Sequence, residues 1–251
     1  VNVASDGTES DGGAAVVDIG GTRGRYVVWQ SAASTLVPDD PNPGVDVFLH
    51  DRDTGTTILV SRLPEAGPVV SSLAPRITPD GRFVFFASSA ALLPTDTDGV
   101  LDVYRYTTAT GELSLVTTTG DAPAGRPGPG PDGRTVVFDA RDGYGPGDAN
   151  GTVDLYVRDL ELEAPVRVTV APSGEPDSRA ATGFPLADGR TVVFLSAATN
   201  LLPGTPFDET RWRLYARDLE AGLTERLDVS ASGEPGNFDV VSAFYAFDVA
   251  G

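Results

Sequence analysis

The chain contains no cysteine, no lysine and no methionine, and His50 is its single histidine. Without thiols it forms neither disulfides nor thiolate metal sites. Its 18 basic residues, all arginine, face 36 acidic ones, and the net charge is −18. Proteins that bind nucleic acid or anionic lipid need a basic surface, so we expect neither partner.

Long hydrophobic runs are also absent. No apolar stretch approaches transmembrane length, so membrane insertion is not expected. The N-terminus lacks the charged and apolar regions of a signal peptide, and we expect a mature or excised segment. Cysteine avoidance fits an extracytoplasmic bacterial protein, whether secreted, periplasmic or at the cell surface. A hydrophobic content of 40% excludes a disordered chain, and 29 glycines and 20 prolines favour short strands joined by turns.

A Gly-Arg segment followed by β-branched and aromatic residues recurs four times, at intervals of 57, 52 and 56 residues. The copies are residues 24–29, 81–86, 133–138 and 189–194. Each predicts a strand, and a second strand follows at 46–48, 102–104, 154–156 and 213–215. A third is expected at 57–60, 113–116, 166–169 and 224–227, and a fourth precedes each Gly-Arg segment, as at 74–78.

Four strands per period in up-and-down order predict an all-β protein, a β-propeller of four-stranded antiparallel blades. We expect blades at about residues 16–73, 74–125, 126–182 and 183–236, with residues 1–15 and 237–251 as strands of a partial blade. Three interpretations of the partial blade stay open. The chain is a piece of a longer propeller, which we favour, or it closes incompletely, or self-association through open blade edges supplies the missing strands.

Two turn segments carry a family resemblance. Residues 78–82 (Thr-Pro-Asp-Gly-Arg) and 130–134 (Gly-Pro-Asp-Gly-Arg) resemble the Ser-Pro-Asp-Gly-Arg motif of TolB-like, PD40-type (WD40-like) bacterial propeller repeats. Residues 147–151, 154–160 and 199–204 match further pieces of that repeat. Blade one has Gly-Gly-Thr-Arg-Gly at 20–24 and blade four lacks the proline, so both turns depart from the motif. The resemblance implies a propeller fold and leaves the activity open.

Catalytic constellations are not evident. The repeat equivalents of His50 are Tyr106, Arg158 and Arg217, which indicates a variable strand position and excludes histidine-rich metal centres. We therefore expect no enzyme, but a non-catalytic binding or scaffold domain for a protein partner. The alternative is a carbohydrate-binding propeller, and a hydrolase or lyase is less well supported. Phe207 and Trp212, in an expanded loop of blade four, are candidate partner contacts.

One acidic pattern recurs in the first three blades, just before the strands expected at 46–48, 102–104 and 154–156. Its members share the same spacing: Asp40, Asn42 and Asp46; Asp96, Asp98 and Asp102; Asp148, Asn150 and Asp154. Oxygen ligands at alternate positions, followed by a carboxylate at the strand start, predict Ca²⁺ loops. The alternative is that they form Asx turns without a metal. Blade four places Arg213 near the last of these positions, where a guanidinium would repel a cation.

Overall fold

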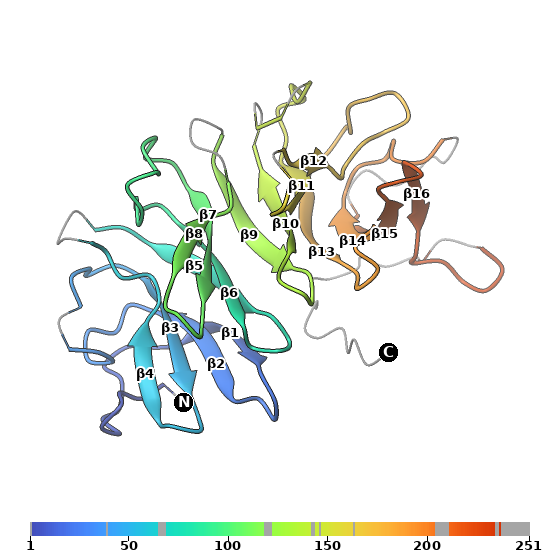
Figure 1. The fold of residues 1–251 in the computed structure, drawn as a ribbon. Helices are drawn as coiled ribbons and strands as arrows, with labels where there is room; N and C mark the ends of the chain where they lie inside the picture. Colours follow the sequence, from blue (N-terminus) through green and yellow to red (C-terminus); the bar gives the residue numbers. More distant parts are fainter. Residues whose placement is uncertain are drawn as a thin grey trace. The chain divides into compact units, whose positions relative to one another are not determined.

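The computed structural model describes residues 2–38, 40–64, 69–117, 122–141, 144–145, 147–162, 164–203, 211–233 and 236. Every regular element within these residues is a β-strand, and the strands form four separate four-stranded antiparallel sheets (Figure 1). No helix in this described part is long and apolar enough to span a membrane. The all-β prediction is confirmed.

Each sheet corresponds to one sequence repeat and is called a blade from here on. Blade one contains β1 (Ala15–Gly20), β2 (Tyr26–Ser31), β3 (Asp46–Asp51) and β4 (Thr56–Leu59). Blade two contains β5 (Ser72–Ile77), β6 (Phe83–Ser88), β7 (Asp102–Thr107) and β8 (Leu113–Leu115). Blade three contains β9 (Ala124–Pro129), β10 (Thr135–Ala140), β11 (Asp154–Asp159) and β12 (Val166–Arg167). Blade four contains β13 (Ala180–Pro185), β14 (Thr191–Ser196), β15 (Arg213–Asp218) and β16 (Leu223–Arg226).

Within each blade the strands are ordered as they occur in the chain. The second strand is buried on both faces: Val136, Val137 and Phe138 of β10 have no exposed surface. A sheet that faced solvent on one side would alternate buried and exposed residues. The continuous apolar segments that identified the repeat are therefore strands buried on both faces.

The Pro-Asp-Gly turns join the first two strands of blades two and three. In blade two the backbone N–H of Arg82 donates to Asp80 Oδ1 at 2.9 Å, and Gly81 adopts a φ of +77°. Arg134 and Asp132 form the same bond in blade three, also at 2.9 Å. The aspartate stabilises the turn and the glycine accepts the left-handed backbone, as the sequence predicts.

The chain divides into two compact units, Val1–Pro129 and Gly130–Gly251. In the first unit, Val28 of blade one and Ile77, Val84 and Phe86 of blade two share one buried cluster. In the second unit, Val137 of blade three and Phe194 of blade four do the same. Neighbouring blades within a unit thus bury each other's faces, which a single blade cannot do for itself.

The N-terminal residues lie against the outer strand of blade one. Val3 and Glu9 form an isolated antiparallel bridge, and the Val3 carbonyl accepts a hydrogen bond from Thr57 Oγ1 at 2.6 Å. Ser5 Oγ accepts from the Thr57 backbone N–H at 2.9 Å. This segment satisfies polar groups of an edge strand that would otherwise be open. The partial blade stays a prediction, and residues 237–251 lie outside the described residues.

Candidate metal centre

The acidic pattern forms a loop before the third strand of blades one, two and three. The last aspartate of each set begins that strand and is buried: Asp46, Asp102 and Asp154. Each accepts a hydrogen bond on Oδ1 from a hydroxyl that follows the fourth strand, that of Ser61, Thr117 or Thr169. One oxygen of each buried carboxylate is thus satisfied in the same way. The three sites differ in what meets the other oxygen, Oδ2.

In blade one an amide group meets the strand-start carboxylate. Asn42 Nδ2 donates to Asp46 Oδ2 at 2.8 Å and to the Val70 carbonyl at 3.0 Å. Asn42 Oδ1 accepts from the N–H groups of Gly44 at 3.0 Å and Val70 at 3.3 Å. Both ends of the amide are used, so its orientation is determined. Since Asp40 also accepts from the Asn42 N–H at 3.0 Å, this loop is a complete Asx-turn network.

In blade three a guanidinium fills the site. Arg167 Nη2 donates to Asp154 Oδ2 and, at 2.5 Å, to Glu175 Oε2, and it lies 3.6 Å from Asp148 Oδ1. Burial acts to lower the pKa of Arg167, but the three carboxylates raise it above its ordinary value. Asn150 Nδ2 also donates to Asp154 Oδ2, at 3.0 Å. The positive charge needed among these acids is therefore supplied by the protein itself.

Blade two has neither of these donors. Asp98 occupies the position of Asn42 and Asn150, and Leu115 occupies the position of Arg167, since Leu115 pairs with Tyr104 as Arg167 pairs with Tyr156. Asp96, Asp98 and Asp102 each offer one oxygen within 4.8 Å of the others. The exposed fraction of Asp96 is 4% and that of Asp102 is 2%. Three carboxylates thus share a small space, and two of them are buried.

Two oxygens of this cluster are left without a hydrogen bond. Asp96 Oδ2 accepts from the Tyr104 hydroxyl and Asp102 Oδ1 accepts from Thr117 Oγ1. Asp96 Oδ1 and Asp102 Oδ2 are buried and have no donor among the described residues. Buried polar atoms are nearly always paired, because leaving one unpaired costs about 1–3 kcal/mol or more. These two oxygens point to a missing positive partner.

The electrostatics of the cluster agree with this interpretation. Burial, opposed by the hydrogen bond from Thr117, raises the pKa of Asp102 to about 6. The carboxylates of Asp98 and Asp96 act in the same direction as burial. A cation held among these oxygens would remove the repulsion that raises this pKa. Asp148, Asp154 and Glu175 of blade three lie as close together as the acids of blade two, but Arg167 already lies among them.

Blade four replaces the pattern with a charge-reversed one. Arg213 begins β15 at the position of Asp102 and is only 6% exposed. Asp228 occupies the position of Thr117 and lies 3.6 Å from Arg213 Nη1. Arg226 donates to both oxygens of Asp228, at 2.7 and 2.8 Å. The structure therefore places an ion-pair network in blade four, where the sequence predicted that a cation would be repelled.

The other candidate residues lie apart from these loops. His50 on β3 is 8% exposed and its Nδ1 is 2.9 Å from Thr57 Oγ1, within hydrogen-bonding distance. Burial lowers the pKa of this imidazole. The Arg179 guanidinium lies over the Trp212 ring, 5.3 Å from its centroid, and Phe207 lies outside the described residues. Asp159 pairs with Arg134 Nε at 2.8 Å and also accepts from the Glu161 N–H at 3.0 Å.

Sequence reasoning missed three members of these sites: Arg167, Glu175 and Tyr104. The signal for Arg167 was present, because the outer strand carries Leu59 and Leu115 in blades one and two but Arg167 and Arg226 in blades three and four. The place of Glu175 could not be read from the repeat, since it comes from the connection between blades three and four.

Comparison with known proteins identifies the fold. No protein-family model matches the chain, and no curated protein matches its sequence. Among solved structures it is similar to TolB from Acinetobacter baumannii, with a TM-score of 0.53 and 16% identity, over 87% of this chain and 45% of that one. TolB from Agrobacterium tumefaciens gives a TM-score of 0.53 and 19% identity, over 90% of this chain and 78% of that one.

Enzymes are also among the similar structures. A puromycin-hydrolysing peptidase from Mycobacterium tuberculosis gives a TM-score of 0.50 and 18% identity, over 86% of this chain but only 29% of the peptidase. This chain spans less than half the length of the first TolB as well. At such identities the likeness extends to the fold alone. The four-stranded blades, their strand order and these matches agree, and the chain has the TolB-like β-propeller fold.

Proposed function

We propose that the chain is a non-catalytic binding domain of an extracytoplasmic protein, which presents loops to a protein partner and holds Ca²⁺ in blade two. The observation that carries the non-catalytic part is the state of His50. The chain has no cysteine and no second histidine, and its single imidazole is buried against Thr57. A general base must reach the proton that it abstracts, and the buried His50 instead has its Nδ1 2.9 Å from Thr57 Oγ1.

The choice of Ca²⁺ for blade two follows from the ligands and their burial. All three side chains offer carboxylate oxygens, which hard cations prefer, and nitrogen or sulfur ligands for zinc are not among them. Mg²⁺ usually keeps several water molecules, whereas Asp96 and Asp102 are almost fully buried. Ca²⁺ accepts more protein oxygens in less regular geometry and fits this cluster better. Asp96, Asp98 and Asp102 would hold it.

A protein partner is favoured over a glycan by the described aromatic residues. Sugar binding uses an exposed aromatic face, and the Trp212 ring is covered by Arg179. The strands themselves are committed to packing, since each second strand is buried on both faces. Loops on a rigid scaffold are the common location of binding residues. An extracytoplasmic location agrees with a Ca²⁺ site of this kind, because extracellular modules bind Ca²⁺ at concentrations of about 0.1–1 mM.

The test is capture of a partner by the immobilised chain from the extracytoplasmic protein fraction of a bacterium that produces it. We expect saturable capture in 2 mM Ca²⁺, unchanged by His50→Gln. The same variant pair is assayed against peptide, ester and glycoside substrates. Turnover of any of these substrates by the unmodified chain would contradict the non-catalytic assignment, and its loss in His50→Gln would assign the activity to His50. Binding to glycans without any protein partner would overturn the choice of partner.

A further inference from the structure

An open pocket lies beside the turns of blades one and two, away from the acidic loops. Its volume is about 740 Å³, within the range of ligand sites. Four of its lining residues are arginines, Arg23, Arg25, Arg52 and Arg82, and two are aspartates, Asp53 and Asp80. The lining therefore has a net positive charge in a chain whose net charge is −18.

Two of these arginines replace residues of another kind in the remaining repeats. The turn position of Arg23 carries Asp80, Asp132 and Asp188 in the other blades, each of which accepts a backbone N–H two residues further on. The position of Arg52 carries Thr108, Leu160 and Leu219, each bonded through its N–H to the carbonyl of the repeat arginine. Blade one has thus exchanged a carboxylate and an uncharged residue for two guanidinium groups, both beside the same pocket.

Arg23 adopts a strained backbone conformation in this turn, which suggests a binding role for its side chain. Its φ is +58°, a left-handed backbone conformation that glycine or asparagine adopts more readily. Strained residues of this kind cluster at binding sites. The Arg23 side chain has no partner among the described residues.

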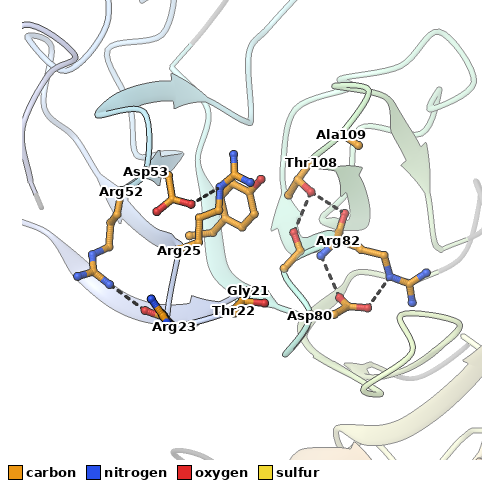
Figure 2. Close-up of a pocket in the computed structure, with 12 residues that line it drawn as sticks. Gly21, Thr22, Arg23, Arg25, Arg52, Asp53, Asp80, Arg82, Thr108 and Ala109 are labelled. Atoms are coloured by element: carbon orange, nitrogen blue, oxygen red, sulfur yellow. Dashed lines mark hydrogen bonds and ion pairs between the residues drawn. The ribbon is translucent and has the colours of Figure 1, made fainter.

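The other arginines of the pocket are held by neighbouring groups. Arg52 Nη1 donates to the carbonyls of Arg23 at 3.2 Å and Gly24 at 2.8 Å, and its Nε and Nη2 groups have no partner among the described residues (Figure 2). Arg25 is held by Asp51, at 2.9 and 2.7 Å, and lies 3.4 Å from Asp53. Figure 2 shows Arg82 and Asp80 paired on the opposite side from Arg23.

We infer that this pocket binds carboxylate groups of a short acidic peptide, a conclusion that rests on the proposed protein-binding function and names the chemistry of the partner. Guanidinium forks recognise carboxylates in paired hydrogen bonds. The Tyr26 ring is poorly placed to stack on a sugar, because the Arg25 guanidinium lies over the ring, 4.8 Å from its centroid.

The overall charge selects a short ligand over a polyanion. Charges interact over about 8 Å at physiological ionic strength. An anion confined to the pocket therefore meets mainly the arginines, whereas a nucleic acid or a sulfated polysaccharide extends over the acidic surface and is repelled.

The test is calorimetric titration with a blocked tetrapeptide that has two central glutamates, beside its glutamine counterpart. We expect the glutamate peptide to bind at least about tenfold more tightly, and its affinity to fall as NaCl is raised.

Arg23→Asp and Arg52→Leu introduce residues that other blades carry at these positions, so both variants should fold. Each should weaken binding about five- to tenfold. Arg141→Asp and Arg141→Leu make the same charge changes at an exposed arginine outside the pocket and should leave binding unchanged.

Equal binding of the two peptides, no binding of either, or equal losses in the Arg141 and pocket variants would overturn the inference. A sulfated oligosaccharide that binds through Arg23 and Arg52 while the glutamate peptide does not would also overturn it. Partner capture separates the two proposals. If Arg23→Asp and Arg52→Leu capture the partner as fully as the unmodified chain, the proposed protein-binding function holds but does not use this pocket. Peptide binding without any captured partner leaves the pocket standing without that function.

Discussion

Arg167 Nη2 in blade three donates to the buried carboxylate of Asp154. At the equivalent place in blade two, Asp102 Oδ2 has no donor among the described residues. The two sites are built from the same backbone and the same strand-start aspartate. Asn150 of blade three is Asp98 in blade two, and Arg167 is Leu115. The site of blade three also includes Glu175, from the connection to blade four. The chain thus contains an internal comparison between a site with a protein guanidinium among its acids and a site that we propose to hold an external cation.

Removal of the arginine tests the neutralised site. Arg167→Leu leaves Asp154, Asp148 and Glu175 without their cation, and breaking a buried ion pair in this way costs about 3–5 kcal/mol. We expect the free energy of unfolding in EDTA, measured with urea, to fall by that amount. Because three carboxylates then face one another, 5 mM Ca²⁺ should recover part of the loss.

The matched control is Arg134→Leu, which removes a more exposed pair with Asp159. Its loss should be much smaller than that of Arg167→Leu, without recovery in Ca²⁺, because exposed ion pairs contribute little. Equal losses in the two variants would contradict the assignment of Arg167 as the substitute for a cation.

The reverse exchange tests blade two. Leu115→Arg brings a guanidinium to the acidic cluster, as Arg167 does in blade three. We expect the melting temperature in EDTA to rise or stay the same, and the increase caused by Ca²⁺ in the unmodified chain to disappear. Leu115→Gln, which is polar but uncharged, should keep the Ca²⁺ response. A full Ca²⁺ response in Leu115→Arg would place the cation elsewhere.

The repeat made the blades predictable, because strands that pack on both faces need a continuous apolar segment, and Pro-Asp-Gly marks the turns of blades two and three. It also located Asp96, Asp98 and Asp102, since their spacing before a strand is visible in the sequence. The occupant of each loop was not predictable in the same way. Whether a carboxylate meets an amide, a guanidinium or no donor depends on residues from another strand, and spacing along the chain does not contain that information.

The stability of the fold should fall at low pH, in part through the ion pair between Arg25 and Asp51. Arg25 donates to both oxygens of Asp51 and lowers the pKa of this carboxyl to about 2. A depressed folded-state pKa gives stability that is present above the unfolded value of about 3.9 and is lost as the pH falls toward 2. Asp51→Asn should lower the free energy of unfolding by about 1 kcal/mol at pH 7. The difference in the free energy of unfolding between Asp51→Asn and the unmodified chain, measured with urea, should shrink between pH 4 and pH 2.

The control is Asp53→Asn, at a more exposed carboxylate near the same arginine, which should change the free energy of unfolding little. A difference that stays constant from pH 7 to pH 2 would exclude this pair as a source of acid sensitivity.

The aromatic pairs between second and third strands should dominate core stability. Phe194 is fully buried and stacks on Tyr215, with ring centroids 5.6 Å apart. Phe194→Ala should lower the free energy of unfolding by about 3–5 kcal/mol, because a cavity remains where the ring was. Leu223→Ala, at a side chain that is 69% exposed, should change it by about 0.5 kcal/mol or less. Similar losses in both variants, measured with urea, would show that Phe194 does not pack as described.

The innermost strands show a second limit of sequence reasoning. Val16, Ala74 and Arg126 have φ values of 48°, 53° and 42°, at equivalent positions of blades one, two and three. The pairing of β1 with β2 and of β5 with β6 shifts register there, as in a β-bulge. Nothing in the side chains of valine, alanine and arginine favours a left-handed backbone, so these residue types do not announce the bulge in the sequence.

The central claim is that blade two requires an external cation, and calorimetric titration of Ca²⁺ into the EDTA-treated chain tests it most directly. Asp98→Asn is the decisive variant, because it restores the residue type that blades one and three carry at this position. We predict one Ca²⁺ bound per unmodified chain and a large loss of affinity in Asp98→Asn, with the fold of the variant intact by circular dichroism. Absence of binding to the unmodified chain, or equal binding to Asp98→Asn, would contradict the account.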